Sequence, residues 1–304
     1  MDFEIIADGL EFPEGPVCCA DGSVIVVEIK AGRITRVRPD GRKEVIATPG
    51  GGPNGLAVGP DGALYVCNNG GFDWYGAEMG LMLPGHAAPD YEVGRIERID
   101  IATGKVERLF DTVDGIKLSG PNDIVFDDAG GFWFTDLGKT RPWGHESGGL
   151  FYAKADGSLV KRVVHGPNMN GVGLSPDGQT VYTALTHERL LLGFDITSPG
   201  EIAPSTGLMP GRVVTSFPGR VLLDSLAVAA DGTICVATLV DAPGIANCHP
   251  TDGSYDIIPF PDLLTTNIAF GGADMRDAWV CLSTTGKLAK CRWDRPGLQL
   301  AHNC

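Results

Sequence analysis

Six polar residues, each at the start of an apolar run, carry the chemistry that this sequence could perform. All six side chains offer an oxygen atom, and two of them are carboxylates. They are Glu14, Asn54, Asn122, Asn170, Asp224 and Asn267. Carboxylate and amide oxygens are the ligands that hard divalent cations such as Ca²⁺, Mg²⁺ and Mn²⁺ prefer. The set therefore predicts a cation site, provided that the six side chains meet.

Charge favours the same interpretation. If Glu14 and Asp224 were buried together without a cation, they would repel each other and one would be driven to protonate. Taken singly, each residue also fits a simpler role, because Asn and Asp often start strands by hydrogen bonding to their own backbone. It is the repetition in register that points to a cation.

Each of these leading residues opens a copy of one pattern. An apolar run of four or five residues is followed by a small-plus-acidic turn and then by a strand rich in Val, Ile, Tyr, Phe or Trp. The copies read EGPVCCADGSVIVVE, NGLAVGPDGALYVCN, NDIVFDDAGGFWFTD, NGVGLSPDGQTVYTA, DSLAVAADGTICVAT and NIAFGGADMRDAWVCL. Asp-Gly accepts the positive φ of a tight turn, and the flanking residues favour strands, so each copy predicts a β-hairpin.

The spacing of the copies leaves room for two more strands in each. Five further runs fill the third-strand position, at 33–38, 94–101, 149–154, 189–196 and 286–293, and only the fifth copy lacks a clear one. Four antiparallel strands per copy predict an all-β fold, a six-bladed β-propeller, as a single domain over residues 1–304. The run FEIIA at 3–7 would supply the outer strand of the last blade and close the ring. A β-sandwich would not explain so regular a repeat, and a parallel α/β fold would need long helices that the sequence lacks.

The predicted fold is what would bring the leading residues together. The first strand of each propeller blade lines the central channel, so its first residue occupies an equivalent place in all six blades. One departure from the repeat is the insertion 69–93, between the second and third strands of the second blade. Its aromatic residues predict a packed segment, placed over one mouth of the channel.

Composition excludes some partners. The net charge of −14 makes nucleic acid and anionic membranes poor partners. The sequence contains no apolar run of about 18 residues, so we expect no membrane span, and the first residues do not resemble a secretory signal. We therefore expect a cytoplasmic protein with its eight cysteines reduced. Cys67, Cys235 and Cys281 lie in apolar runs and are expected to be buried; no pattern indicates an oligomeric state.

Five segments resemble the SMP-30/gluconolactonase/LRE-like family. They are FPEGP at 12–16, PNG at 53–55, GPNDIVFD at 120–127, NGVGLSPDG at 170–178 and DSLAVAADG at 224–232. The resemblance implies a six-bladed propeller with one divalent cation in its channel. It places the metal ligands at Glu14, Asn122, Asn170 and Asp224, and it places Asn54 near the metal or the substrate. Asn267 matches no well-defined ligand of the family.

The family's common reaction is the hydrolysis of lactones, which implies a small, sugar-derived lactone as substrate. The cation would act as a Lewis acid on the lactone carbonyl while water attacks it. Asp224 is our candidate general base, and water activated directly on the cation is the alternative. Ca²⁺ is the first choice of metal, and Zn²⁺, Mn²⁺, Mg²⁺ and Fe²⁺ also suit oxygen and amide ligands.

Two other functions fit the same ligand set. One is hydrolysis of organophosphates or phosphoesters, and the other is a non-enzymatic, ligand-binding propeller with structural Ca²⁺. No GxSxG or HExxH motif supports a different hydrolase. Predicted substrate contacts are Asn54, Asn122, Trp74, His145 and His187. We expect substrate choice to depend on the insertion and on the loops near 137–148 and 240–256.

Overall fold

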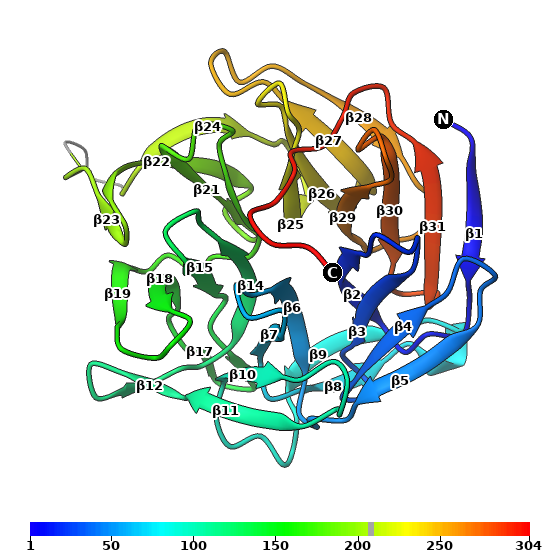
Figure 1. Cartoon of the computed structure of the whole chain (residues 1–304), viewed down its shortest axis with the longest axis horizontal. Helices are drawn as coiled ribbons and strands as arrows, with labels where there is room; N and C mark the ends of the chain where they lie inside the picture. The colour runs from blue at the N-terminus through cyan, green and yellow to red at the C-terminus, as the bar shows by residue number, and fades with distance from the viewer. Residues whose placement is uncertain (206–209) are drawn as a thin grey trace.

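Six small antiparallel sheets stand around a central channel (Figure 1). The computed structural model describes residues 1–205 and 210–304. The first three blades, from the channel outward, are β2 (Pro13–Cys18), β3 (Val24–Glu28), β4 (Arg33–Val37) and β5 (Lys43–Ala47); β6 (Pro53–Val58), β7 (Leu64–Asn68), β10 (Arg95–Ile99) and β11 (Val106–Phe110); and β14 (Pro121–Phe126), β15 (Gly131–Asp136), β18 (Gly149–Lys154) and β19 (Val160–His165). This confirms the predicted six-bladed propeller.

The remaining blades follow the same order. They are β20 (Val172–Leu174), β21 (Thr180–Leu185), β22 (Leu190–Ser198) and β24 (Arg212–Ser216), with β23 (Glu201–Ile202) beside β22; β25 (Val221–Val228), β26 (Ile234–Val240), β27 (Gly244–Cys248) and β28 (Tyr255–Pro259); and β29 (Thr265–Gly271), β30 (Asp277–Leu282), β31 (Lys287–Arg292) and β1 (Phe3–Ala7). The third strand of the fifth blade is β27, whose small residues Gly244 and Ala246 weakened its pattern in the sequence.

The turns between first and second strands form as their residues dictate. Between β2 and β3, Asp21 Oδ1 accepts a hydrogen bond from Ser23 N (3.0 Å), and Gly22 takes a φ of 80°. Asp61 and Asp231 accept the same bond in the second and fifth blades. A carboxylate that caps its own turn and a glycine at positive φ together fix the hairpin.

The first strand of the chain closes the circle of blades. β1 pairs antiparallel with β31, with Phe3 opposite Cys291 and Ile5 opposite Ala289. The last blade is thus built from both ends of the sequence, as predicted. The hydrophobic cores lie between neighbouring blades, and they include Cys67, Cys235 and Cys281, all fully buried and free.

The insertion 69–93 forms a hairpin of its own. β8 (Phe72–Tyr75) pairs with β9 (Leu83–Ala87), and the short 3₁₀ helix η1 (Ala77–Met79) lies between them. Phe72 and Trp74 pack against the core between the first two blades, and Met82 N donates to Thr284 O in the sixth blade. Since Asn68, the last residue of β7, pairs with Pro53, the hairpin leaves the sheet at the end of the channel where the inner strands begin.

One expectation about the cysteines is wrong. Cys19 and Cys304 form a disulfide across a sequence separation of 285 residues, whereas we expected all eight cysteines to be reduced. The pair forms because the last residues of the sequence return across the channel to the first blade, where Ala20 N donates to Cys304 O (2.8 Å). Over residues 1–205 and 210–304, no helix has the length and apolar character that crossing a membrane requires.

Candidate metal centre

Regular strand pairing breaks at the leading residues. The register of the inner strand shifts between Glu14 and Val17, Pro53 and Leu56, Pro121 and Ile124, Leu223 and Leu226, and Thr265 and Asn267. In the fourth blade, β20 begins only two residues after Asn170. A β-bulge bends its strand and changes the direction of a side chain. The same irregularity therefore recurs where each inner strand reaches the channel.

Small residues after the leading residues let neighbouring blades approach. A Cβ built on Gly15 would lie 2.5 Å from the carbonyl oxygen of Asn54, and one on Gly171 would lie 2.7 Å from that of Asp224. Gly55 stands against the Asn122 backbone in the same way. Such distances leave no room for a side chain, so glycine is required for the inner strands to come this close.

Side-chain hydrogen bonds link further blades. Asn267 Nδ2 in the sixth blade donates to Glu14 Oε2 in the first (2.7 Å), and Val172 N in the fourth donates to Asp123 Oδ2 in the third (3.2 Å). The inner strands of the fifth and sixth blades, β25 and β29, are also in contact. The structure therefore brings the starts of the six inner strands together around the channel.

The six leading residues, here called the ring, include two amide oxygens that have no hydrogen-bond partner within the described residues. They are Oδ1 of Asn122 and Oδ1 of Asn170, and both are buried. The amide of Asn170 is held by its other end, since its Nδ2 donates to Thr186 Oγ1 (3.0 Å). Buried acceptors are normally paired, so two unpaired ones in the same ring indicate a missing positive partner.

The carboxylates of the ring are unfavourable as they stand. Burial and then the charge of Glu14 raise the pKa of Asp224 well above its usual value, and burial raises the pKa of Glu14 despite its bond from Asn267. Burial and the charge of Glu14 also raise the pKa of the neighbouring Asp123 to about 7. A cation among these groups would remove the repulsion and favour their ionised forms.

The donors present fit an oxygen-ligated cation. Among residues 1–205 and 210–304, no three His, Cys, Asp or Glu side chains gather as a metal site, so a nitrogen- or sulfur-rich centre has no candidate there. Glu14 and Asp224 supply the charge, and Asn122 and Asn170 supply the unpaired amide oxygens. This is the donor chemistry of Ca²⁺ and other hard cations.

The other predicted site residues lie in different surroundings. Asn54 is buried in the ring beside Gly15. Trp74 packs against Phe12, with ring centroids 5.1 Å apart. His145 and His187 are exposed and lie near each other, with their rings perpendicular and their centroids 6.3 Å apart. The structure thus pairs the two histidines, while Trp74 is engaged in packing.

Lys139 is a buried cation that sequence reasoning missed. It is 1% exposed, its Nζ donates to Asn69 O (2.7 Å), and it stands over the ring of Phe72 (3.9 Å). Burial lowers the pKa of Lys139 to about 7. A lysine in the loop after β15 gave no signal, because its partners belong to the insertion of another blade.

Comparison with known proteins agrees with the fold and the motifs. Residues 12–284 match the family described as SMP-30/Gluconolactonase/LRE-like region. A gluconolactonase of Zymomonas mobilis is 26% identical over 208 residues, which cover 60% of this chain and 51% of that protein. The lactonase drp35 of Staphylococcus saprophyticus is 28% identical over 239 residues, which cover 77% of this chain and 65% of that one. The chain thus spans about half to two thirds of the length of these curated relatives.

Among solved structures, regucalcin of Agrobacterium tumefaciens, described as a calcium-binding protein, superposes with a TM-score of 0.73 at 19% identity and covers 98% of both chains. At that identity the likeness bears on the fold, and it agrees with the six blades described above. The family match, which covers residues 12–284, shows that the chain belongs to the SMP-30/gluconolactonase/LRE-like family.

Proposed function

We propose that this protein is a metal-dependent lactonase that opens a small, sugar-derived lactone. The observation that carries the proposal is the composition of the ring: two carboxylates whose pKa values are raised by burial, that of Asp224 also by the charge of Glu14, stand with two buried amide oxygens that have no partner among the described residues. The relatives named gluconolactonase and lactonase support the reaction class, and the calcium-binding neighbour supports Ca²⁺ as the first metal to test.

Glu14, Asn122, Asn170 and Asp224 would hold the cation. When bound, a divalent cation supplies a Lewis acid that stabilises negative charge developing on the lactone carbonyl oxygen. Asn267 holds the Glu14 carboxylate through its Oε2, and Thr186 holds the Asn170 amide so that Oδ1 stays free. These two bonds orient the ligands before substrate arrives.

Asp224 is the proposed general base. As a residue it is less enclosed than Glu14, which is only 2% exposed, whereas Asp224 is half-buried. Its carboxylate would take the proton of the attacking water and return it to the ring oxygen that leaves the acyl carbon. Glu14 accepts hydrogen bonds from Asn267 Nδ2 and Gly15 N, so its carboxylate would serve as a charged metal ligand and not as the base.

Asn54, His145, His187 and Trp74 remain our proposed substrate contacts, together with Asn122. The two histidines are the exposed pair among them, so they are suited to hydroxyl groups of a sugar-derived ring. Replacing both by alanine should raise KM for a sugar lactone several-fold and leave kcat within a factor of about three, since they lie outside the ring.

The decisive experiment combines metal analysis with activity on a panel of lactones and organophosphates. Purified protein should contain about one divalent ion per chain, and chelation should abolish lactone hydrolysis until metal is restored. Asp224→Asn should lower kcat by about 10²–10⁴-fold. The exposed Asp128→Asn is the matched control and should keep full activity.

Each alternative has its own result. Full lactonase activity in chelated protein would refute the proposal. Higher kcat/KM on organophosphates than on any lactone would move the function to phosphoester hydrolysis. A large rise in melting temperature with metal, and no turnover on either panel, would identify a structural ion in a binding protein.

A further inference from the structure

A cavity in the channel runs from the strand starts toward the last residues of the sequence. Its volume is about 480 Å³, within the range of sites that hold small organic molecules. The later residues of the inner strands line most of it, and it also reaches Gly15, Asp123 and Asn267 at the strand starts. Most of its wall is aliphatic or aromatic: Val17, Leu56, Val58, Ile124, Phe126, Val172, Leu174, Leu226, Val228, Ile268, Phe270, Leu298 and Leu300.

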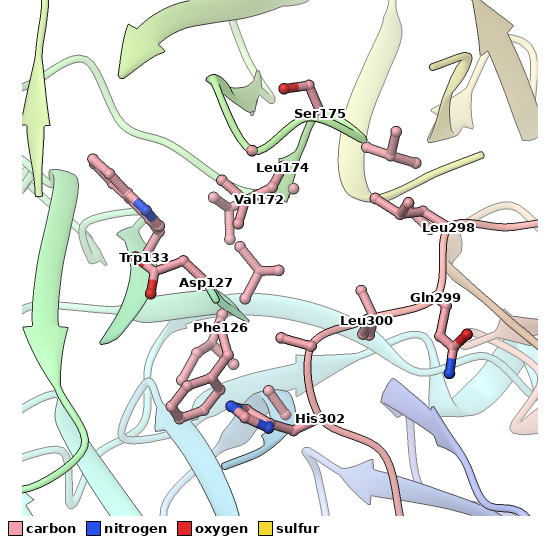
Figure 2. Close-up of a pocket in the computed structure, with 18 of the residues that line it drawn as sticks. Phe126, Asp127, Trp133, Val172, Leu174, Ser175, Leu298, Gln299, Leu300 and His302 are labelled. Atoms are coloured by element: carbon pink, nitrogen blue, oxygen red, sulfur yellow. The ribbon is translucent and has the colours of Figure 1, made fainter. Parts of the chain in front are cut away.

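Residues 298–304, here called the strap, cross the mouth of this cavity (Figures 1 and 2). Leu298 N donates to Val228 O (2.9 Å) on one side, and Cys304 is tied to Cys19 on the other. Between these anchors the His302 ring meets the edge of Phe126, with centroids 5.6 Å apart. The strap thus covers the apolar wall without filling the space behind it.

Two nitrogen atoms of aromatic side chains at the cavity have no hydrogen-bond partner within the described residues. One is Nε1 of Trp133, a side chain that is 0% exposed, and the other is Nε2 of His302. Figure 2 shows Trp133 at the cavity wall with its nitrogen on the side toward Val172. An indole N–H can only donate, so a ligand that satisfied it would carry an acceptor oxygen.

The charges at the cavity restrict the ligand further. No lysine or arginine is among the described residues that line it, whereas Asp123, Asp127, Asp128 and Asp177 are. An anionic amphiphile such as a fatty acid would bring its carboxylate among these groups without a cation to receive it. We propose that this cavity is a binding site for an uncharged, largely apolar molecule with a carbonyl or ether oxygen, which accepts a hydrogen bond from Trp133 Nε1.

Fluorescence titration of the full-length protein with prodan, a neutral naphthyl ketone, tests the site. Ala269 and Ala227 line the cavity and are partly exposed, so a larger side chain at either position takes up space in the cavity. Ala269→Phe and, independently, Ala227→Phe should weaken prodan binding at least tenfold with unchanged circular dichroism. The exposed Ala102→Phe, in the turn after β10, is the matched control and should bind as the parent does.

Trp133→Phe tests the hydrogen bond. It should weaken binding of prodan by about tenfold. N-phenyl-1-naphthylamine, which lacks a carbonyl, should bind the variant and the parent equally. In competition, 2-dodecanone should displace prodan and dodecanoate should not. The proposal is overturned if both cavity-filling variants bind prodan like the parent, if Trp133→Phe weakens both probes equally, or if dodecanoate competes as well as the ketone.

Discussion

The Asn267 side chain acts on the candidate cation site through another residue. Its Nδ2 donates to Glu14 Oε2 at 2.7 Å, and both side chains are buried. A carboxylate held by a neutral donor keeps its charge while losing the freedom to rotate. We therefore place Asn267 among the positioning residues of the ring.

Replacing Asn267 should weaken metal binding more than it changes the fold. For Asn267→Ala we expect a 10–100-fold loss of Ca²⁺ affinity, because partners that orient a ligand typically contribute that much. Competition with a chromophoric chelator measures the affinity. Asn303→Ala, on the exposed strap, is the control and should bind Ca²⁺ normally. Equal affinities for the two variants would show that Asn267 does not position Glu14.

The sequence predicted the place of the leading residues but not their partners. Six oxygen-bearing side chains in register follow from the hairpin repeat alone. The Asn267–Glu14 bond joins the sixth blade to the first across a separation of 253 residues, and nothing local encodes it. The four proposed ligands remain a prediction, which the unpaired oxygens of Asn122 and Asn170 support.

At the scale of elements, the spacing of the inner strands depends on the glycines that follow three of the leading residues. Gly55 and Gly171 have no side chain to keep the neighbouring strand away, and neither has a positive φ. Their requirement is therefore steric and not conformational. The motif Asn-Gly at a strand start predicts this close approach only once the propeller is known.

Gly171→Ala should both destabilise the protein and impair the ring. Its Cβ would meet the backbone of Asp224 and Ser225, so the fourth and fifth blades must separate, at a cost of about 2–3 kcal/mol in unfolding free energy. Denaturant titration measures this cost. Gly144→Ala, whose Cβ would meet nothing within 4 Å, is the control and should change stability by less than about 0.5 kcal/mol.

The insertion hairpin is attached to the third blade by Lys139. Its ammonium group is buried against Asn69 O and the Phe72 ring. Among the described residues it forms no ion pair with Asp136 or Glu146, whose charges act on its pKa. The sequence predicted a packed insertion from its aromatic residues, and Phe72 and Trp74 do pack. The hairpin of β8 and β9 was not predicted, since Gly and Pro interrupt its alternation.

Lys139 makes stability depend on pH with a definite sign. Its folded pKa of about 7 lies below the ordinary value of 10.5, so between these values the unfolded chain binds more protons and stability rises with pH. The unfolding free energy of the parent minus that of Lys139→Met should rise with pH, by up to about 1.4 kcal/mol per pH unit from pH 7 to 9. Urea titrations measure it, and the exposed Lys117→Met should show no such trend. A parallel pair of pH profiles for the parent and Lys139→Met would contradict the assignment.

At the scale of the whole molecule, two links close the circle of blades. β1 joins the last blade by backbone hydrogen bonds, and the Cys19–Cys304 disulfide joins the strap to the first blade. The first closure could be predicted, because FEIIA supplies the missing fourth strand of a regular repeat. The second could not, since two cysteines 285 residues apart carry no local pattern and the strap lies outside the repeat.

Removing the disulfide should lower global stability and loosen the strap. A cross-link that spans nearly the whole chain restricts the unfolded state strongly, so Cys304→Ser should reduce the unfolding free energy by about 2–4 kcal/mol. The adjacent free Cys18 provides the control, and Cys18→Ser should keep the disulfide and most of the stability. A thiol reductant should lower the melting temperature of the parent and of Cys18→Ser but leave Cys304→Ser unchanged. If the reductant shifts none of the three, Cys19 and Cys304 are not bonded in solution. Because the strap crosses the far mouth of the channel, prodan should also bind faster to Cys304→Ser than to the parent, which stopped-flow fluorescence would measure.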